Sequence, residues 1–263
     1  MKTPEKVRCS YSAADGLRLT APRSWRELTQ DELRLVFALQ ARYAEAAVVK
    51  TRLLLKMCGL RVRKKVAGGA LVSLVGQKDT PIIYIATWQL QSLIHQFDYI
   101  DTYEGMGVRL ARLQGLHAVD VNLHGLCFSD YMNVEKAYQH FLMKEDPSWL
   151  GEMARILYRT EQGDAVERLV LTGTEQVAVI AWWAYIKAQF AHRFRHLFKP
   201  ARPSEGRMDE WKWQETVDAQ LRALTDGDVT KEEAVGAIDC WRALTELNAI
   251  VREAAEFNDR LKN

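Results

Sequence analysis

The sequence predicts a mainly α-helical (α+β) protein. We expect a helical bundle core, a small β-hairpin or sheet element in the N-terminal half, and a long C-terminal helix. Three observations support this fold class. Apolar residues recur at spacings of three and four from residue 129 onward, which is typical of amphipathic helices. In the segment 60–86, apolar and polar residues alternate over LRVRKKV and β-branched residues are frequent. A narrow apolar stripe runs through the last 30 or so residues, close to the heptad spacing of paired helices.

The chain begins with a short arm over 7–19 that we expect to be extended. Two capping boxes follow, because Ser24 precedes Glu27 by three residues and Thr29 precedes Glu32 by three. A Ser or Thr hydroxyl and a Glu three residues later satisfy each other's backbone amides at a helix start. The sequence therefore predicts that the first helix begins here.

A second helix is predicted over 46–57 from its apolar face. In 60–86, the alternating LRVRKKV, three glycines and the run PIIYIA predict two or three strands, including a hairpin. A helix over 87–97 follows. The glycine-punctuated segment 99–123 predicts no regular element.

From residue 129 the helical signal is stronger. Asp146 as N-cap and Pro147 in the first turn predict a new helix, and thus an αα-hairpin. The run 177–186 is apolar all round, which predicts a helix buried at the centre of the core. Because they keep helical spacing among aliphatic residues, we expect four aromatic residues to lie in the core rather than on a binding surface. These are Tyr131, Tyr138, Phe141 and Trp149.

The segment 199–209, KPARPSEGRMD, contains two prolines and a glycine and predicts a linker. It separates a mostly helical N-terminal domain, 1–198, from a C-terminal helical hairpin, 210–263. The hairpin ends in a long helix opened by Thr230 with Glu233 three residues on. We favour packing of its apolar stripe within the chain over packing on another molecule. The stripe comprises Ala234, Ile238, Trp241, Leu244, Leu247, Val251, Ala254, Phe257 and Leu261.

The net charge of the chain narrows the classes of function that it can have. The chain has 36 Lys and Arg against 34 acidic residues, so its net charge of +2 argues against a surface wholly devoted to nucleic acid. The segment 50–65 is nevertheless basic, with seven cations and no acid. Its candidate phosphate contacts are Arg61, Arg63, Lys64 and Lys65. We favour the alternative of a solvated helix face followed by a charged edge strand, because lysines protect exposed strand edges from aggregation.

No catalytic, metal or cofactor pattern is present, and we expect no enzyme and no cofactor. The cysteines Cys9, Cys58, Cys127 and Cys240 form no metal spacing and predict free thiols. His192 and His196 are one helical turn apart but lack the glutamate of a zinc-protease motif. His124, Cys127 and Asp130 contain the letters of a nucleophilic triad without its strand-turn-helix setting. GMGVRLARLQG, over 105–115, is not a phosphate loop.

The sequence also predicts a partner surface. Trp211 and Trp213 flank a lysine in a polar context after the proline-rich segment, and together with Trp241 they are the expected partner-binding residues. No apolar run is long enough to cross a membrane and no secretory signal opens the chain, so we expect no membrane association and a cytoplasmic location.

Several phrases carry a family resemblance, in this order: PRSWRELTQDELRLV, LCFSDYMNVEKAYQHFL, LGEMARILYR, WWAYIKAQFAHRFRHLFKP and LTDGDVTKEEAVGAIDCWRALTELNAIVREAAE. They resemble phage and prophage proteins of tail or virion modules, some of which are tail-assembly-chaperone-like. The resemblance implies a non-enzymatic assembly or virion protein, located in the host cytoplasm or in the particle. Implied partners are other phage structural or tail proteins, including a helical one, or a second copy. The alternative is a nucleic-acid-binding protein that uses 50–65.

Overall fold

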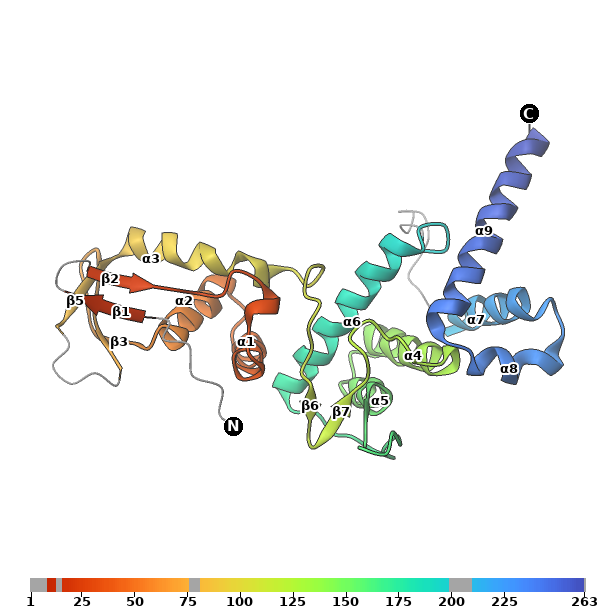
Figure 1. The fold of residues 1–263 in the computed structure, drawn as a ribbon, viewed down its shortest axis with the longest axis horizontal. Helices are drawn as coiled ribbons and strands as arrows, with labels where there is room; N and C mark the ends of the chain where they lie inside the picture. Colours follow the sequence, from red (N-terminus) through yellow and green to blue (C-terminus); the bar gives the residue numbers. More distant parts are fainter. Residues whose placement is uncertain (1–8, 13–15, 76–80, 199–209, 263) are drawn as a thin grey trace. The chain divides into compact units, whose positions relative to one another are not determined.

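The computed structural model describes residues 9–12, 16–75, 81–198 and 210–262. It is mainly helical with small antiparallel sheets, which confirms the predicted fold class (Figure 1). The chain divides into two compact units, Met1–Met106 and Gly107–Asn263. The predicted linker 199–209 lies outside the described residues, and residues 210–263 belong to the same compact unit as 107–198. In the described part of the chain, no helix combines the length and apolar composition that a membrane crossing requires.

The first unit begins with a two-stranded hairpin and two helices. Thr29 and Glu32 form the predicted capping box, in which the Glu32 amide donates to Thr29 Oγ1 and the Thr29 amide donates to Glu32 Oε2. Ser24 makes no such side-chain bond and precedes only a short 3-10 turn. The elements are β1 (Cys9–Ser12), β2 (Gly16–Leu19), η1 (Trp25–Glu27), α1 (Gln30–Arg42) and α2 (Ala46–Met57).

The predicted strand segment forms a three-stranded antiparallel sheet in the order β3-β4-β5. The strands are β3 (Leu60–Val66), β4 (Gly69–Leu74) and β5 (Ile83–Ala86). β3 lies at an edge, as expected for a lysine-rich strand. α3 (Thr87–Ile94) and the 3-10 helix η2 (His95–Asp101) follow, so the predicted helix over 87–97 is divided between two helix types.

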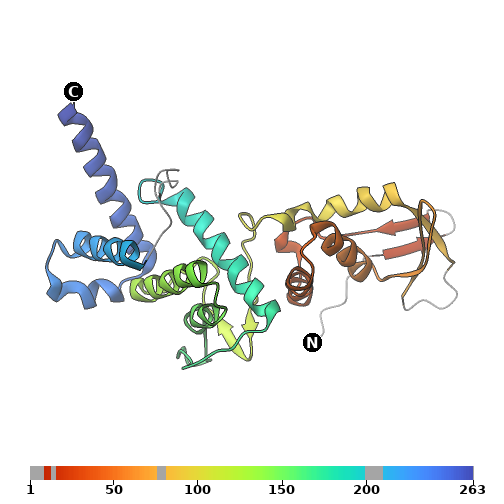
Figure 2. The ribbon, with the colours of Figure 1, turned by 180° about the vertical axis from the view of Figure 1, so that it is seen from behind.

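In the second unit, α4 (Phe128–Lys144) and α5 (Ser148–Leu157) form the predicted αα-hairpin. α5 begins one residue later than predicted, with Pro147 as its N-cap residue, and Asp146 Oδ1 accepts a hydrogen bond of 2.9 Å from the Ser148 amide. α6 (Gly173–Arg193) lies beside them, with Trp182 and Trp183 fully buried, which confirms its central place (Figure 2). Of the four aromatic residues expected in the core, Tyr131 is buried and Tyr138, Phe141 and Trp149 are half-buried.

A second three-stranded sheet was not predicted. Its strands have two or three residues each and lie partly in the segment 99–123, for which the sequence predicts no regular element. They are β6 (Arg112–Leu113), β7 (Leu116–Ala118) and β8 (Tyr158–Arg159), in the order β6-β7-β8. Strands this short carry no alternation that could be recognised in a sequence.

The C-terminal region corrects one prediction. The final helix does not run unbroken from Thr230, because Ile238 and Cys240 exchange backbone hydrogen bonds with the segment 126–128. The chain therefore leaves the helical conformation at Ile238 and Asp239 and starts again. The elements are α7 (Glu210–Thr225), η3 (Val229–Lys231), α8 (Glu232–Ala237) and the long α9 (Cys240–Lys262).

Candidate functional site

The basic edge strand β3 contains a β-bulge that divides its cations between two faces. Val62 pairs with Val72, but Lys64 then pairs with Leu71. Arg63 is therefore an extra residue that has no opposite residue on β4 in the strand register. A bulge shifts the alternation of the strand by one residue. Lys65, opposite Ala70, consequently lies on the face of Val72, whereas Lys64 lies on the face of Leu71.

Three of the four predicted phosphate contacts share one face of this sheet. Arg61, Arg63 and Lys64 are exposed, and Arg63 Nε donates a hydrogen bond of 2.8 Å to Ser73 Oγ. Tyr84, which is opposite Leu71 in the register, is 50% exposed on the same face. Within the described ranges no carboxylate pairs with any of these cations. The face is thus positively charged and carries one accessible aromatic ring.

Charge is distributed unequally over the chain. Residues 1–106 contain 16 Lys and Arg against 10 Asp and Glu, whereas residues 107–263 contain 20 against 24. The first unit is therefore basic, although the net charge of the whole chain is close to zero. Such an asymmetry favours an anionic partner for the first unit.

The basic segment is nevertheless smaller than the sequence suggests. Lys50 is buried, and its ammonium lies 2.5 Å from carboxylate oxygens of both Asp98 and Asp101. Burial alone would lower the pKa of Lys50, but the hydrogen bonds from its ammonium to Asp101 and Asp98 outweigh burial and raise it. Arg52 lies over the ring of Tyr43, 4.3 Å from its centroid. Lys50 is thus a structural ion-pair partner rather than a phosphate contact.

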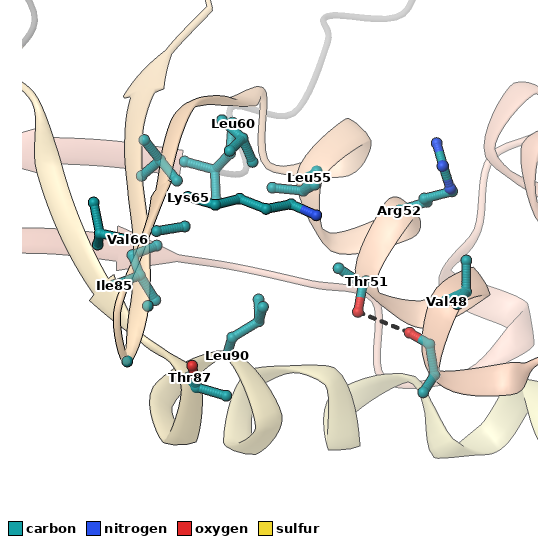
Figure 3. A pocket seen from close by; sticks show the side chains of 16 residues that line it. Val48, Thr51, Arg52, Leu55, Leu60, Lys65, Val66, Ile85, Thr87 and Leu90 are labelled. Atoms are coloured by element: carbon teal, nitrogen blue, oxygen red, sulfur yellow. Dashed lines mark hydrogen bonds between the residues drawn. The ribbon is translucent and has the colours of Figure 1, made fainter.

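The opposite face of the sheet, with α2 and α3, lines a groove of about 700 Å³ (Figure 3). Leu55 from α2, Val66 and Ile85 from the sheet and Leu90 from α3 make most of its wall apolar. The side chain of Lys65 extends along the groove toward α2. No described carboxylate lines it, so the groove contains no acid and base pair that could carry out proton transfer.

The three tryptophans predicted as a partner surface have different environments. Trp211 is 72% exposed on α7, whereas Trp213 on the same helix is 7% exposed. Trp241 is half-buried at the start of α9, where its ring packs against Phe190 and Phe194 at centroid distances of 5.2 and 5.5 Å. The three therefore do not form one exposed surface, because Trp213 is buried and Trp241 is half-buried within its own unit. Of the three, Trp211 is the exposed residue.

An apolar stripe that the sequence analysis assigned to intramolecular packing is instead covered over only half its length. At the start of α9, Ala243 and Leu247 are buried against the second unit. Beyond them, the C-terminal half of α9 runs clear of α7 and α8 in both views (Figures 1 and 2). Val251 of the predicted stripe is half-buried there, as is Ala255, whereas four apolar residues are exposed, namely Ile250 (38%), Ala254, Phe257 (62%) and Leu261 (71%). We call these four residues the distal seam.

The three residue types of a nucleophilic triad, at positions 124, 127 and 130, have other partners in the fold. His124 stacks on Trp241 at 4.8 Å, Asp130 accepts a hydrogen bond of 2.5 Å from Arg159, and Cys127 contacts the Ser129 hydroxyl. Cys240 is buried, and burial together with Asp239 raises its pKa to about 12. No cluster of metal-ligating side chains occurs among the described residues, and Cys58, Cys127 and Cys240 are free thiols. The side chain of Cys9 lies outside those described.

Comparison of the chain with known protein families, curated proteins and solved structures finds no match. Two exposed features of the described chain are suited to contact a partner. They are the basic sheet face, formed by Arg61, Arg63, Lys64 and Tyr84, and the distal seam.

Proposed function

We propose that this chain is a non-enzymatic assembly protein of the phage or prophage tail-module kind that its sequence resembles, and that it engages a helical partner through the distal seam. One observation carries the proposal. The apolar stripe that holds α9 to its own unit continues without a break into an exposed half. Exposed apolar surface costs about 25 cal/mol for each Å² in contact with water, so a second surface that covers it is favoured.

The spacing of the distal seam favours a helix as the partner. Ile250, Ala254, Phe257 and Leu261 are separated by four, three and four residues, which places them on one narrow side of α9. Apart from Val251 and Ala255, the other positions over 251–262 are polar, and Arg252 and Glu256 form an ion pair one turn apart. Because α9 is already helical, binding requires little additional ordering of this segment.

A photo-crosslinking residue at position 257 tests the proposal. The tagged full-length chain is incubated in its native lysate after nuclease treatment, irradiated, and the cross-linked peptides are identified by mass spectrometry. We expect cross-links to an α-helical segment of one defined protein. The matched control carries the same group at position 211, which is 72% exposed against 62% for position 257 and lies on α7.

The Ile250→Asp substitution places a charge at the start of the distal seam and should abolish the cross-link from position 257. Equal labelling from positions 211 and 257, or labelling that survives Ile250→Asp, would show that the seam is not a specific surface. The proposal would then be wrong.

A specific observation supports a second candidate function, which is binding of nucleic acid by the basic sheet face. Arg61, Arg63 and Lys64 of β3 lie on the same sheet face as the exposed ring of Tyr84 of β5, with β4 between them. Cations combined with an aromatic ring are typical of single-strand binding surfaces. Lys64→Glu should weaken binding of single-stranded DNA and lower the slope of affinity against salt by about one. Arg26→Glu, an exposed cation elsewhere in the first unit, is the control. Equal effects of the two substitutions would argue against this function.

A further inference from the structure

The exposed half of α9 continues a heptad pattern that begins in its buried half. With Leu247 at position a, Ala254 and Leu261 are also at a, and Ile250 and Phe257 are at d. Two charged residues, Glu253 and Arg260, then flank the seam at the g positions. These g residues are the ones that set partner choice and orientation in paired helices.

Side-chain sizes along the distal seam are self-complementary in one orientation. In an antiparallel pair, each a residue faces a d residue of the other helix. Phe257 would then face Ala254 of a second copy, and Ile250 would face Leu261. Each layer thus combines side chains that fill the space between two helices. A parallel pair would instead set the two Phe257 rings together and leave the two Ala254 residues opposite each other, with a void between them.

The flanking charges favour the same orientation. In an antiparallel pair the g positions of the two helices face one another, so Glu253 meets Arg260 of the second copy, and the two-fold symmetry repeats this contact. In a parallel pair g faces e, and Glu253 would meet the uncharged Asn258. Glu253 is well exposed, with 69% of its side chain accessible, so it can make this contact without leaving a buried position.

We infer that the helical partner of α9 is α9 of a second copy of this chain, paired antiparallel over the distal seam. This inference rests on the proposed function of that surface and identifies the partner. The contact spans residues 250–261, about 18 Å of helix at 1.5 Å per residue. Because this interface is short, association will depend on protein concentration.

Sedimentation equilibrium of the full-length chain over a wide concentration range tests the pairing. We expect a reversible monomer-dimer equilibrium. Glu253→Arg and Arg260→Glu, each alone, would create two like-charge contacts and weaken the dimer about tenfold. An equal mixture of these two single variants would restore it, because every g contact between the two different chains is then attractive. Asp259→Lys, on the side of α9 away from the seam, should leave the dimer unchanged.

Each result decides the inference. A wild-type chain that stays monomeric at all concentrations, or a dimer that neither charge reversal weakens, would overturn antiparallel self-pairing. Reversals that weaken the dimer without rescue in the mixture would also overturn it. If the chain is monomeric while position 257 still cross-links to a helix of a different protein, the proposed function stands without this inference. If neither dimer nor cross-link is found, both fail.

Discussion

Trp241 Nε1 donates a hydrogen bond of 2.7 Å to the backbone carbonyl of Asn122, 119 residues earlier in the chain. The ring also packs edge-on against Phe190 of α6. These contacts fix the first turn of α9 to the body of the second unit. The distal seam begins nine residues, or about two and a half turns, further along the same anchored helix.

Trp241→Ala should destabilise the second unit by about 3 kcal/mol, because it removes both the ring packing and the partner of the Asn122 carbonyl. Trp211→Ala removes an exposed ring and should change stability by less than about 0.5 kcal/mol. Chemical denaturation followed by circular dichroism measures both. A similar loss in the two variants would contradict the different environments of these tryptophans.

Lys50→Met keeps most of the buried stem and removes the ammonium that Asp98 and Asp101 share. We expect a loss of about 1–2 kcal/mol in the free energy of unfolding of the first unit, since both carboxylates remain accessible to water.

The pH dependence of this loss has a defined sign. The hydrogen bonds from Lys50 and then His95 lower the pKa of Asp98 below its ordinary value of 3.8. The ion pair therefore stabilises the fold fully above that value, and its contribution disappears as the pH falls through the lowered pKa of the folded state. Thermal unfolding of wild type and variant should differ at pH 6 and converge as the pH falls through the lowered pKa of Asp98. A difference that is independent of pH would contradict the ion-pair account.

Gly69→Ala should destabilise the sheet of the first unit. A Cβ atom at this position would lie 2.7 Å from the Tyr84 ring and even closer to the Ile85 carbonyl oxygen. Removing this steric overlap requires a shift of the β4-β5 pairing, which should lower the free energy of unfolding by about 2 kcal/mol or more. Gly105→Ala, where a Cβ meets no atom within 4 Å, should be neutral or slightly stabilising. Differential scanning fluorimetry compares the two, and equal melting temperatures would show that β4 and β5 are not in this register.

Cys240 should resist alkylation in the folded protein. With a pKa of about 12, roughly one in 10,000 of its thiols is ionised at pH 8, and the sulfur is also buried. Cys127, which is half-buried, should be modified first by iodoacetamide, and peptide mass mapping gives both rates. In denaturant the two cysteines should react alike. Similar rates in the native protein would contradict the packing of α9 on the segment 123–128.

Local patterns predicted most of the fold. The Thr29 capping box and the aspartate before Pro147 act through neighbouring residues, so their helices begin close to the expected positions. The apolar run 177–186 likewise predicted a buried helix, because a helix that is apolar on all sides avoids water when other elements cover it.

The remaining features depend on contacts between distant residues. Lys50 appeared to be one cation of a basic segment until the fold placed Asp98 and Asp101 beside it. The break before α9 comes from pairing with a segment more than 100 residues away. Similarly, the periodicity of the final stripe could not show where its intramolecular cover ends: Leu247 is its last buried residue, Val251 is half-buried and Ala254 is exposed.

Hydrogen-deuterium exchange of the full-length chain tests the central claim most directly. The chain is measured when dilute and in the assembly it forms, with itself or with a captured protein. Helix pairing suppresses the local opening that allows amides to exchange. We predict slower exchange over 250–261 in the assembly and unchanged exchange over the basic strand 60–66. Unchanged exchange over 250–261 together with slower exchange over 60–66 would contradict the claim that the distal seam is the binding surface.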